Sequence, residues 1–189
     1  MRFSISAQVR RCAAAIGLSS ALLTWCCAAA DAATGEPARL EGSLIDGKQF
    51  SVQAQRGKVV LVVLWATWCP VCRRELPKFE QFYREQKARG FEIVALSVDD
   101  TPREVRQFLA KHPYSFPIGW RNQFNDNMGR VEGTPTMVLI DRQGTIRARY
   151  EGALDDAEWW AIEDAIAGKT DERACDESWF LPGFMRRAL

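Results

Sequence analysis

The seven residues Val59–Trp65 constrain the fold of this chain more than any other feature, because all seven are apolar. A strand with one face in solvent alternates between apolar and polar residues, whereas a strand covered on both faces does not. The run therefore predicts a central strand that is buried on both sides.

Two cysteines, Cys69 and Cys72, stand shortly after this strand. If a helix begins at Cys69, its sulfur lies at the helix N-terminus, where free amides and the helix dipole favour thiolate over thiol. Cys72 then lies one turn further along, within disulfide reach, so we expect Cys69 to be the more exposed and more acidic thiol. The pair predicts a redox centre. A structural disulfide or half a zinc site are the alternatives, but zinc needs four ligands and the sequence offers no second such pair or histidine cluster, so we expect no metal.

The composition fits one globular domain with additional segments, since the 189 residues are 47% hydrophobic and 26% charged. The formal net charge is +1, and no basic block is interleaved with aromatic residues. Both observations argue against nucleic acid as a partner.

Residues 1–30 have the pattern of an export signal. Arg2, Arg10 and Arg11 precede eighteen uncharged residues, Ala13–Ala30, whose last members are small enough for a cleavage site. Removing the three arginines leaves 25 − 3 = 22 basic and 24 acidic residues, so the mature chain would have a net charge of −2.

An uncleaved membrane anchor is the main alternative for this segment, because eighteen uncharged residues can nearly cross a bilayer. Lipid attachment at Cys26 or Cys27 is less favoured, because bulky Trp25 stands where a lipid-attachment motif has a small residue. With either outcome we expect the domain to be periplasmic, soluble or tethered to the inner membrane. In such an oxidising compartment a reducing cysteine pair needs continual re-reduction.

Turn and capping signals divide the remaining chain into a linker over residues 31–38, a domain over residues 39–168 and a tail over residues 169–189. Because Pro117 disfavours regular structure, we expect residues 117–133 to be irregular. The other predicted elements are a hairpin over Leu40–Ser51 with its turn at Asp46-Gly47, a helix over Pro70–Arg89 that contains Pro77, a strand over Phe91–Val98, a helix from Thr101 to about Lys111, a strand over Thr136–Ile140, an outer strand over Thr145–Tyr150 and a last helix from Asp155 or Asp156 to Gly168.

This order of elements, with the cysteine pair after the first long strand, resembles the thioredoxin fold. That fold is α/β, with a central mixed β-sheet flanked by helices, and here it would carry an N-terminal β-hairpin extension. The segments WATWCPVCRRELP (Trp65–Pro77) and VEGTPTMVLIDRQG (Val131–Gly144) resemble, more narrowly, the TlpA/ResA/CcmG-like group of exported thiol:disulfide oxidoreductases. The resemblance extends from about Arg39 to Ala167.

The resemblance implies a role for each matching residue. Cys69 would be the attacking cysteine and Cys72 the resolving one, and Thr134-Pro135 would form a cis-proline turn that faces them. A cis X-Pro bond costs little compared with other cis bonds, and its backbone can pair with an extended substrate. Trp68 and Pro70, beside the attacking sulfur, complete the predicted substrate-binding set. The alternative for Gly-Thr-Pro-Thr is an ordinary loop that ends at a strand.

Glu75 is the candidate for proton transfer. Thioredoxins carry a buried aspartate six residues before the first cysteine, and Val63 occupies that position here. Glu75, three residues past Cys72, lies on a neighbouring helical face and could replace it, since ResA-like proteins carry a glutamate at this place. The alternative is a solvent-exposed glutamate in an early helical turn.

The dipeptide Pro70-Val71 between the cysteines favours a reducing role, because it lacks the histidine of strong oxidants. The reduction potential would lie nearer the roughly −270 mV of thioredoxin than the roughly −120 mV of the strong oxidant. The resemblance implies apocytochrome c or copper-site assembly proteins as clients, the proteins whose reactive cysteines are reduced. It also implies a CcdA/DsbD-like membrane thiol carrier as electron donor.

Thiol exchange needs no cofactor, and Arg73 stands where a haem-attachment motif has histidine. Two alternative functions remain open in the sequence. One is copper handling by a Sco-like relative, for which the only histidine is His112; the other is a non-catalytic thioredoxin-fold binding module or holdase. Cys175 in the tail is either a free thiol or part of an intermolecular or partner contact.

Overall fold

The structure, a computed structural model, describes residues 34–169. The predictions made for residues 1–30, for Cys26, Cys27 and Cys175, and for nearly all of the tail lie outside these residues. Within residues 34–169, no helix combines the length and the apolar composition that crossing a membrane requires.

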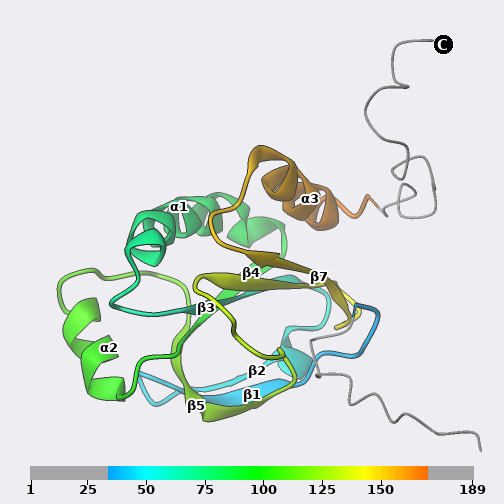
Figure 1. Cartoon of the computed structure of the whole chain (residues 1–189). Helices are drawn as coiled ribbons and strands as arrows, with labels where there is room; N and C mark the ends of the chain where they lie inside the picture. Colours follow the sequence, from blue (N-terminus) through cyan, green and yellow to red (C-terminus); the bar gives the residue numbers. More distant parts are fainter. Residues whose placement is uncertain (1–33, 170–189) are drawn as a thin grey trace, which may run out of the picture.

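Seven strands and three α-helices make up the domain (Figure 1). Two 3-10 helices, labelled η, complete the secondary structure of residues 34–169. In chain order the elements are β1 (Leu40–Leu44), β2 (Gln49–Ser51), η1 (Val52–Gln55), β3 (Val59–Trp65), α1 (Pro70–Gln86), η2 (Lys87–Arg89), β4 (Phe91–Ser97), α2 (Pro102–Leu109), β5 (Ile118–Asp126), β6 (Thr136–Ile140), β7 (Ile146–Glu151) and α3 (Asp156–Ile166).

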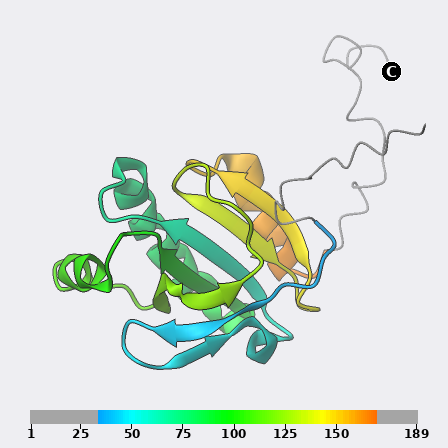
Figure 2. The ribbon, with the colours of Figure 1, turned by 60° about the horizontal axis from the view of Figure 1, so that its bottom comes forward.

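The strands form one mixed sheet in the order β2-β1-β5-β4-β3-β6-β7. Strand β3 is parallel to β4 and antiparallel to β6, and β4 is parallel to β5. The hairpin β1–β2 extends the sheet at one edge and β7 closes the other, as Figure 2 shows. This is the predicted thioredoxin fold with its N-terminal hairpin, whose turn glycine Gly47 has the positive φ of 86° expected at Asp-Gly.

Strand β3 is buried on both faces, as its unbroken apolar sequence predicted. Leu61, Val63 and Trp65 belong to the core on the helical face, whereas Val60, Val62 and Leu64 belong to a second core on the opposite face. The second core is closed by residues of the hairpin, of η1 and of the loop after β5, such as Phe50, Val52 and Met128.

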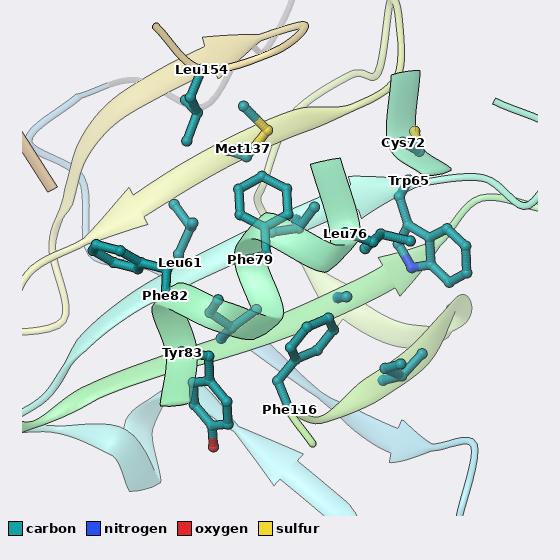
Figure 3. Packing of buried hydrophobic residues seen from close by; sticks show 14 of the residues in the cluster. Leu61, Trp65, Cys72, Leu76, Phe79, Phe82, Tyr83, Phe116, Met137 and Leu154 are labelled. Atoms are coloured by element: carbon teal, nitrogen blue, oxygen red, sulfur yellow. The ribbon is translucent and has the colours of Figure 1, made fainter. Parts of the chain in front are cut away.

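The helical face carries the larger core, to which all three α-helices contribute. Figure 3 shows Leu76 and Phe79 of α1 among side chains of the sheet, with Cys72 at the end of this core. The helix α1 is continuous through Pro77, and Gly90, with a φ of 84°, ends the η2 turn that follows it. The redox motif is therefore anchored to the core by the buried face of α1.

The prediction that residues 117–133 are irregular is confirmed for residues 127–133, which lie in no helix or strand, but was wrong for residues 118–126, which form β5. Its polar sequence concealed it, since the strand pairs with β4 only over Ile118–Trp120 and otherwise with β1. Pro117 precedes the strand and lacks only the amide hydrogen; its carbonyl accepts from the Ala95 amide of β4 at 2.9 Å. Gly119 is required there, since a Cβ atom would lie 2.4 Å from the Phe124 ring.

Candidate redox site

Cys69 is the N-cap of α1, as predicted, and Pro70 is its first helical residue. The Cys69 Sγ accepts a hydrogen bond from the Cys72 amide at 3.1 Å. Proline suits the first position of a helix because its missing amide hydrogen would have no partner there. The helix therefore begins with its free amides directed at the first sulfur.

The Thr134-Pro135 peptide bond is cis, and it lies opposite this sulfur. The Cys69 thiol donates to the Thr134 carbonyl at 3.2 Å, although the two residues are 65 positions apart. The Thr136 hydroxyl donates to the Gly133 carbonyl at 2.7 Å and closes the turn. The structure thus brings the two predicted motifs together.

The two thiols differ in acidity. Burial alone would raise the pKa of Cys69, but hydrogen bonds with the Cys72 and Thr134 side chains and from the Cys72 and Val71 amides outweigh it, and its pKa is lowered. Burial, together with the hydrogen bond and charge of Cys69, raises the pKa of Cys72 to about 12. The expected order of acidity follows from this geometry. The expected difference in exposure is small, since Cys69 is 3% exposed and Cys72 is 1% exposed.

Trp68 marks the exposed side of the site, with 65% of its surface accessible. It lines an open groove of about 660 Å³ that runs to Gly133 and Thr134. The other lining residues come from β5, from the loop that follows it and from the end of β4: Val98, Arg121, Asn122, Phe124, Asp126, Gly129, Arg130, Val131 and Glu132. Sequence reasoning missed this groove because it did not recognise β5.

The charged residues of the groove are paired within the protein. Arg121 contacts Asp126 at 2.9 Å, and Arg130 contacts Glu132 at 3.0 Å. The Arg121 guanidinium also donates to the Gly129 carbonyl at 2.7 Å. The wall of the groove therefore carries compensated charge.

Glu75 is buried and 2% exposed, so the structure does not support the alternative of a solvent-exposed glutamate. Its Oε1 accepts from Lys78 Nζ at 2.9 Å, while its buried Oε2 has no hydrogen-bond partner within the described residues. Glu75 and Cys72 both belong to the buried face of α1. The structure therefore presents this oxygen of Glu75 on the same helical face as Cys72.

The other residues weighed as ligands are not gathered at the site. Across residues 34–169, no three His, Cys, Asp or Glu side chains are close enough together to hold a metal ion. His112 is exposed, and its ring contacts that of Phe108 in a tilted arrangement, with 4.7 Å between the ring centroids. It follows the end of α2.

A thioredoxin fold with two cysteines at the start of its first α-helix, facing a cis-proline turn, defines the class of thioredoxin-like proteins with a dithiol site. The Redoxin family matches residues 30–165, which is more than half of the chain. The chain belongs to the Redoxin family.

Individual relatives agree with this placement. The thiol-disulfide oxidoreductase ResA of Oceanobacillus iheyensis is 33% identical over 111 residues, which cover 58% of this chain and 58% of the relative. ResA of Bacillus cereus is 32% identical over 114 residues, which cover 57% of this chain and 63% of the relative. The chain thus spans about three fifths of the length of these curated relatives.

A solved structure extends the comparison to nearly a whole molecule. The crystal structure of a thiol:disulfide interchange protein of the thioredoxin family from Chlorobium tepidum superimposes with a TM-score of 0.61 and 27% identity. The match covers 71% of this chain and 98% of that one.

Proposed function

We propose that this protein is a thiol:disulfide oxidoreductase that reduces disulfides of exported client proteins. The main observation behind the proposal is that the pKa values of the two thiols are shifted in opposite directions. The pKa of Cys69, at the helix N-terminus, is lowered, and the pKa of Cys72, one turn further along, is raised. Disulfide exchange needs one thiol that is ionised and attacks first, and a second thiol that stays protonated until it resolves the mixed disulfide. The names of the ResA relatives and of the Chlorobium protein support this activity.

The reaction runs in two exchanges. The Cys69 thiolate attacks one sulfur of the client disulfide, a mixed disulfide forms, and the other client sulfur leaves as a thiolate that takes up a proton. Cys72 then loses its proton and attacks Cys69 Sγ. The second client sulfur leaves, so the client gains two electrons and the protein holds a Cys69–Cys72 disulfide.

The second exchange needs a base. Because burial raises the pKa of Cys72 to about 12, this thiol is almost entirely protonated at neutral pH. Loss of the Cys69 charge in the mixed disulfide relieves part of this shift, but burial, its largest cause, remains. We assign proton removal to Glu75, whose unpartnered Oε2 is buried on the same helical face.

The client would bind beside Cys69. Trp68 and Pro70 flank the sulfur, and Thr134, which the cis bond to Pro135 holds opposite the sulfur, lies at the end of the groove. Pro70-Val71 offers no charge that would make the disulfide strongly oxidising, which favours reduction. Apocytochrome c and copper-site assembly proteins are the proposed clients, with a CcdA/DsbD-like membrane thiol carrier in the periplasm as the source of electrons.

Single cysteine variants test this function. Cys72→Ser leaves the mixed disulfide unresolved, so non-reducing electrophoresis of the exported variant should show covalent adducts that disappear on reduction. Cys69→Ser should form few or none, because Cys72 is a protonated thiol with 1% exposure. The trapped partners identify the clients. Absence of adducts from both variants would contradict the proposal and favour a non-catalytic binding module.

A further inference from the structure

Asp99, just past the end of β4, is a buried carboxylate that the reaction above does not use; it is 2% exposed. Both of its oxygens accept the Thr67 amide, Oδ1 at 3.2 Å and Oδ2 at 3.0 Å. Oδ1 also accepts the Thr67 hydroxyl at 2.6 Å, and Oδ2 accepts the Ser97 hydroxyl at 2.5 Å. A carboxylate with this many donors is fixed in place.

The sheet brings Asp99 and Thr67 together. Trp65 pairs with Ser97 in the parallel ladder of β3 and β4, so Thr67 and Asp99 each lie two residues beyond that pair. The Asp99 carbonyl accepts from the Trp120 indole at 2.7 Å, which ties this corner to β5 as well. The carboxylate therefore reaches Thr67 from a rigid support.

Thr67 is held from two sides, two residues before the attacking cysteine. Asp99 binds its amide and hydroxyl, and Arg73 Nε donates to its carbonyl at 2.7 Å. The next backbone contact is at Cys69 itself, whose amide donates to the Ala66 carbonyl at 3.2 Å. Every polar group of Thr67 is thus engaged, directly before the backbone enters α1.

We propose that Asp99 is a positioning residue that aligns Cys69 with Cys72 and with the Thr134 carbonyl by fixing Thr67. This inference rests on the proposed redox role of the two cysteines. Two groups react efficiently when their approach is set in advance, and a displacement of about 1 Å can lower a rate about a hundredfold. Without Asp99, the loop would sample more positions and the two sulfurs would meet less often.

A purely structural role is the competing explanation, and Glu92 provides the matched control. Glu92 is also a buried carboxylate of β4, 7% exposed, but it lies at the opposite end of the strand. It accepts from the Tyr83 hydroxyl at 2.8 Å and from Lys58 Nζ at 3.2 Å. Its loss should lower stability and leave the cysteine pair unaffected.

The experiment compares Asp99→Asn with Asp99→Ala in the full chain, using the equilibrium between the Cys69–Cys72 disulfide and dithiothreitol. Both variants lack the charge, so its effect on the thiolate cancels between them. Asparagine retains an oxygen for Thr67, and its amide can donate to the Ser97 hydroxyl; alanine retains neither contact. We expect the equilibrium constant for disulfide formation to be about tenfold lower for alanine than for asparagine, equivalent to about 30 mV.

The Glu92→Gln and Glu92→Ala pair should agree within about twofold in the same equilibrium. If the two Asp99 variants also agree within twofold, the positioning role is wrong. If Asp99→Ala does not fold, Thr67→Val is compared with Thr67→Ser instead. Valine lacks the hydroxyl that Asp99 accepts, so only Thr67→Val should lower the equilibrium constant for disulfide formation, by about threefold. Equal constants for the two Thr67 variants would overturn the positioning role of Asp99. Dithiothreitol needs no client, so a failure of client trapping would contradict the proposed function without affecting this result.

Discussion

At the residue scale, Glu75 is the position where burial changes the interpretation most. An acidic residue early in a helix is ordinarily explained by the helix dipole. Here the carboxylate is inside the core face of α1, and its ion-pair partner, Lys78, has a side chain that is 58% exposed. The observations favour a chemical role over a capping role.

Glu75→Gln tests that role. We expect the rate of disulfide exchange near pH 7 to fall by about a hundredfold, because Cys72 would have to lose its proton to water. The loss should shrink as the pH rises toward the pKa of Cys72. Glutamine has nearly the same shape as glutamate and keeps an oxygen that can accept from Lys78, so we expect the fold to be retained. Stopped-flow measurement of exchange from pH 6 to 10 checks this.

Glu85→Gln is the control for Glu75→Gln, because Glu85 is an exposed glutamate of the same helix. Its pH profile should match that of the parent protein. If the Glu75 variant has the same profile as well, proton transfer has to be assigned to another group.

The sequence located the cysteine pair because its signals are local: an apolar strand, a proline and a helix period within a short stretch. It could name Glu75 but could not establish that the side chain is buried, because that depends on how α1 packs. Nothing in the sequence indicated a role for Asp99, because its contact with Thr67 forms only when β3 and β4 pair. Contacts between strands carry no signature in either strand alone.

At the scale of elements, β5 and the hairpin explain why the groove exists. Strand β4 ends at Ser97, which pairs with Trp120, and beyond this point β5 continues beside β1 and contributes Arg121, Asn122, Phe124 and Asp126 to the groove. Gly42 of β1 permits this pairing, since a Cβ atom there would lie 2.3 Å from the Gln123 carbonyl oxygen. Sequence propensity alone would not predict such a strand, because its partner lies about 80 residues earlier in the chain.

The loop after β5 is held by an arginine from β7. Arg149 Nη1 donates to the Met128 carbonyl at 2.6 Å, and Nη2 donates to the Arg130 carbonyl. Arg149→Lys removes this fork, because a single ammonium group cannot reproduce two parallel donors. We expect unfolding free energy to fall by about 1–3 kcal/mol and KM for a client disulfide to rise, with kcat less affected.

Urea denaturation and steady-state exchange kinetics measure the Arg149→Lys effects. Arg147→Lys, on the same strand, is the matched control, because Arg147 is 52% exposed and reaches only Asp141, at 3.9 Å. Its stability should stay within about 0.5 kcal/mol of the parent value. An unchanged KM in the Arg149 variant would show that this clamp does not shape the groove.

At the scale of the whole molecule, the shifted pKa values of the two thiols make the stability of the dithiol protein depend on pH. In the unfolded chain both thiols have ordinary pKa values of about 8.5. Below that pH the folded dithiol protein already carries the Cys69 thiolate, so the unfolded state binds more protons and stability rises with pH. Above it the folded protein keeps the Cys72 proton up to about pH 12, so the unfolded state binds fewer protons and stability falls.

The dithiol protein should therefore gain stability from its cysteines most strongly near pH 8.5, relative to a Cys69→Ser, Cys72→Ser double variant. On the alkaline side the difference in unfolding free energy should decline by up to about 1.4 kcal/mol per pH unit. The subtraction removes the other groups that titrate there, such as Tyr150, whose pKa is raised to about 12 by burial and the nearby Glu158 charge. Urea denaturation of both proteins under reducing conditions from pH 6 to 11 gives the difference curve. A flat curve would mean that the folded protein does not separate the two thiol pKa values, and the asymmetry on which the exchange mechanism depends would be absent.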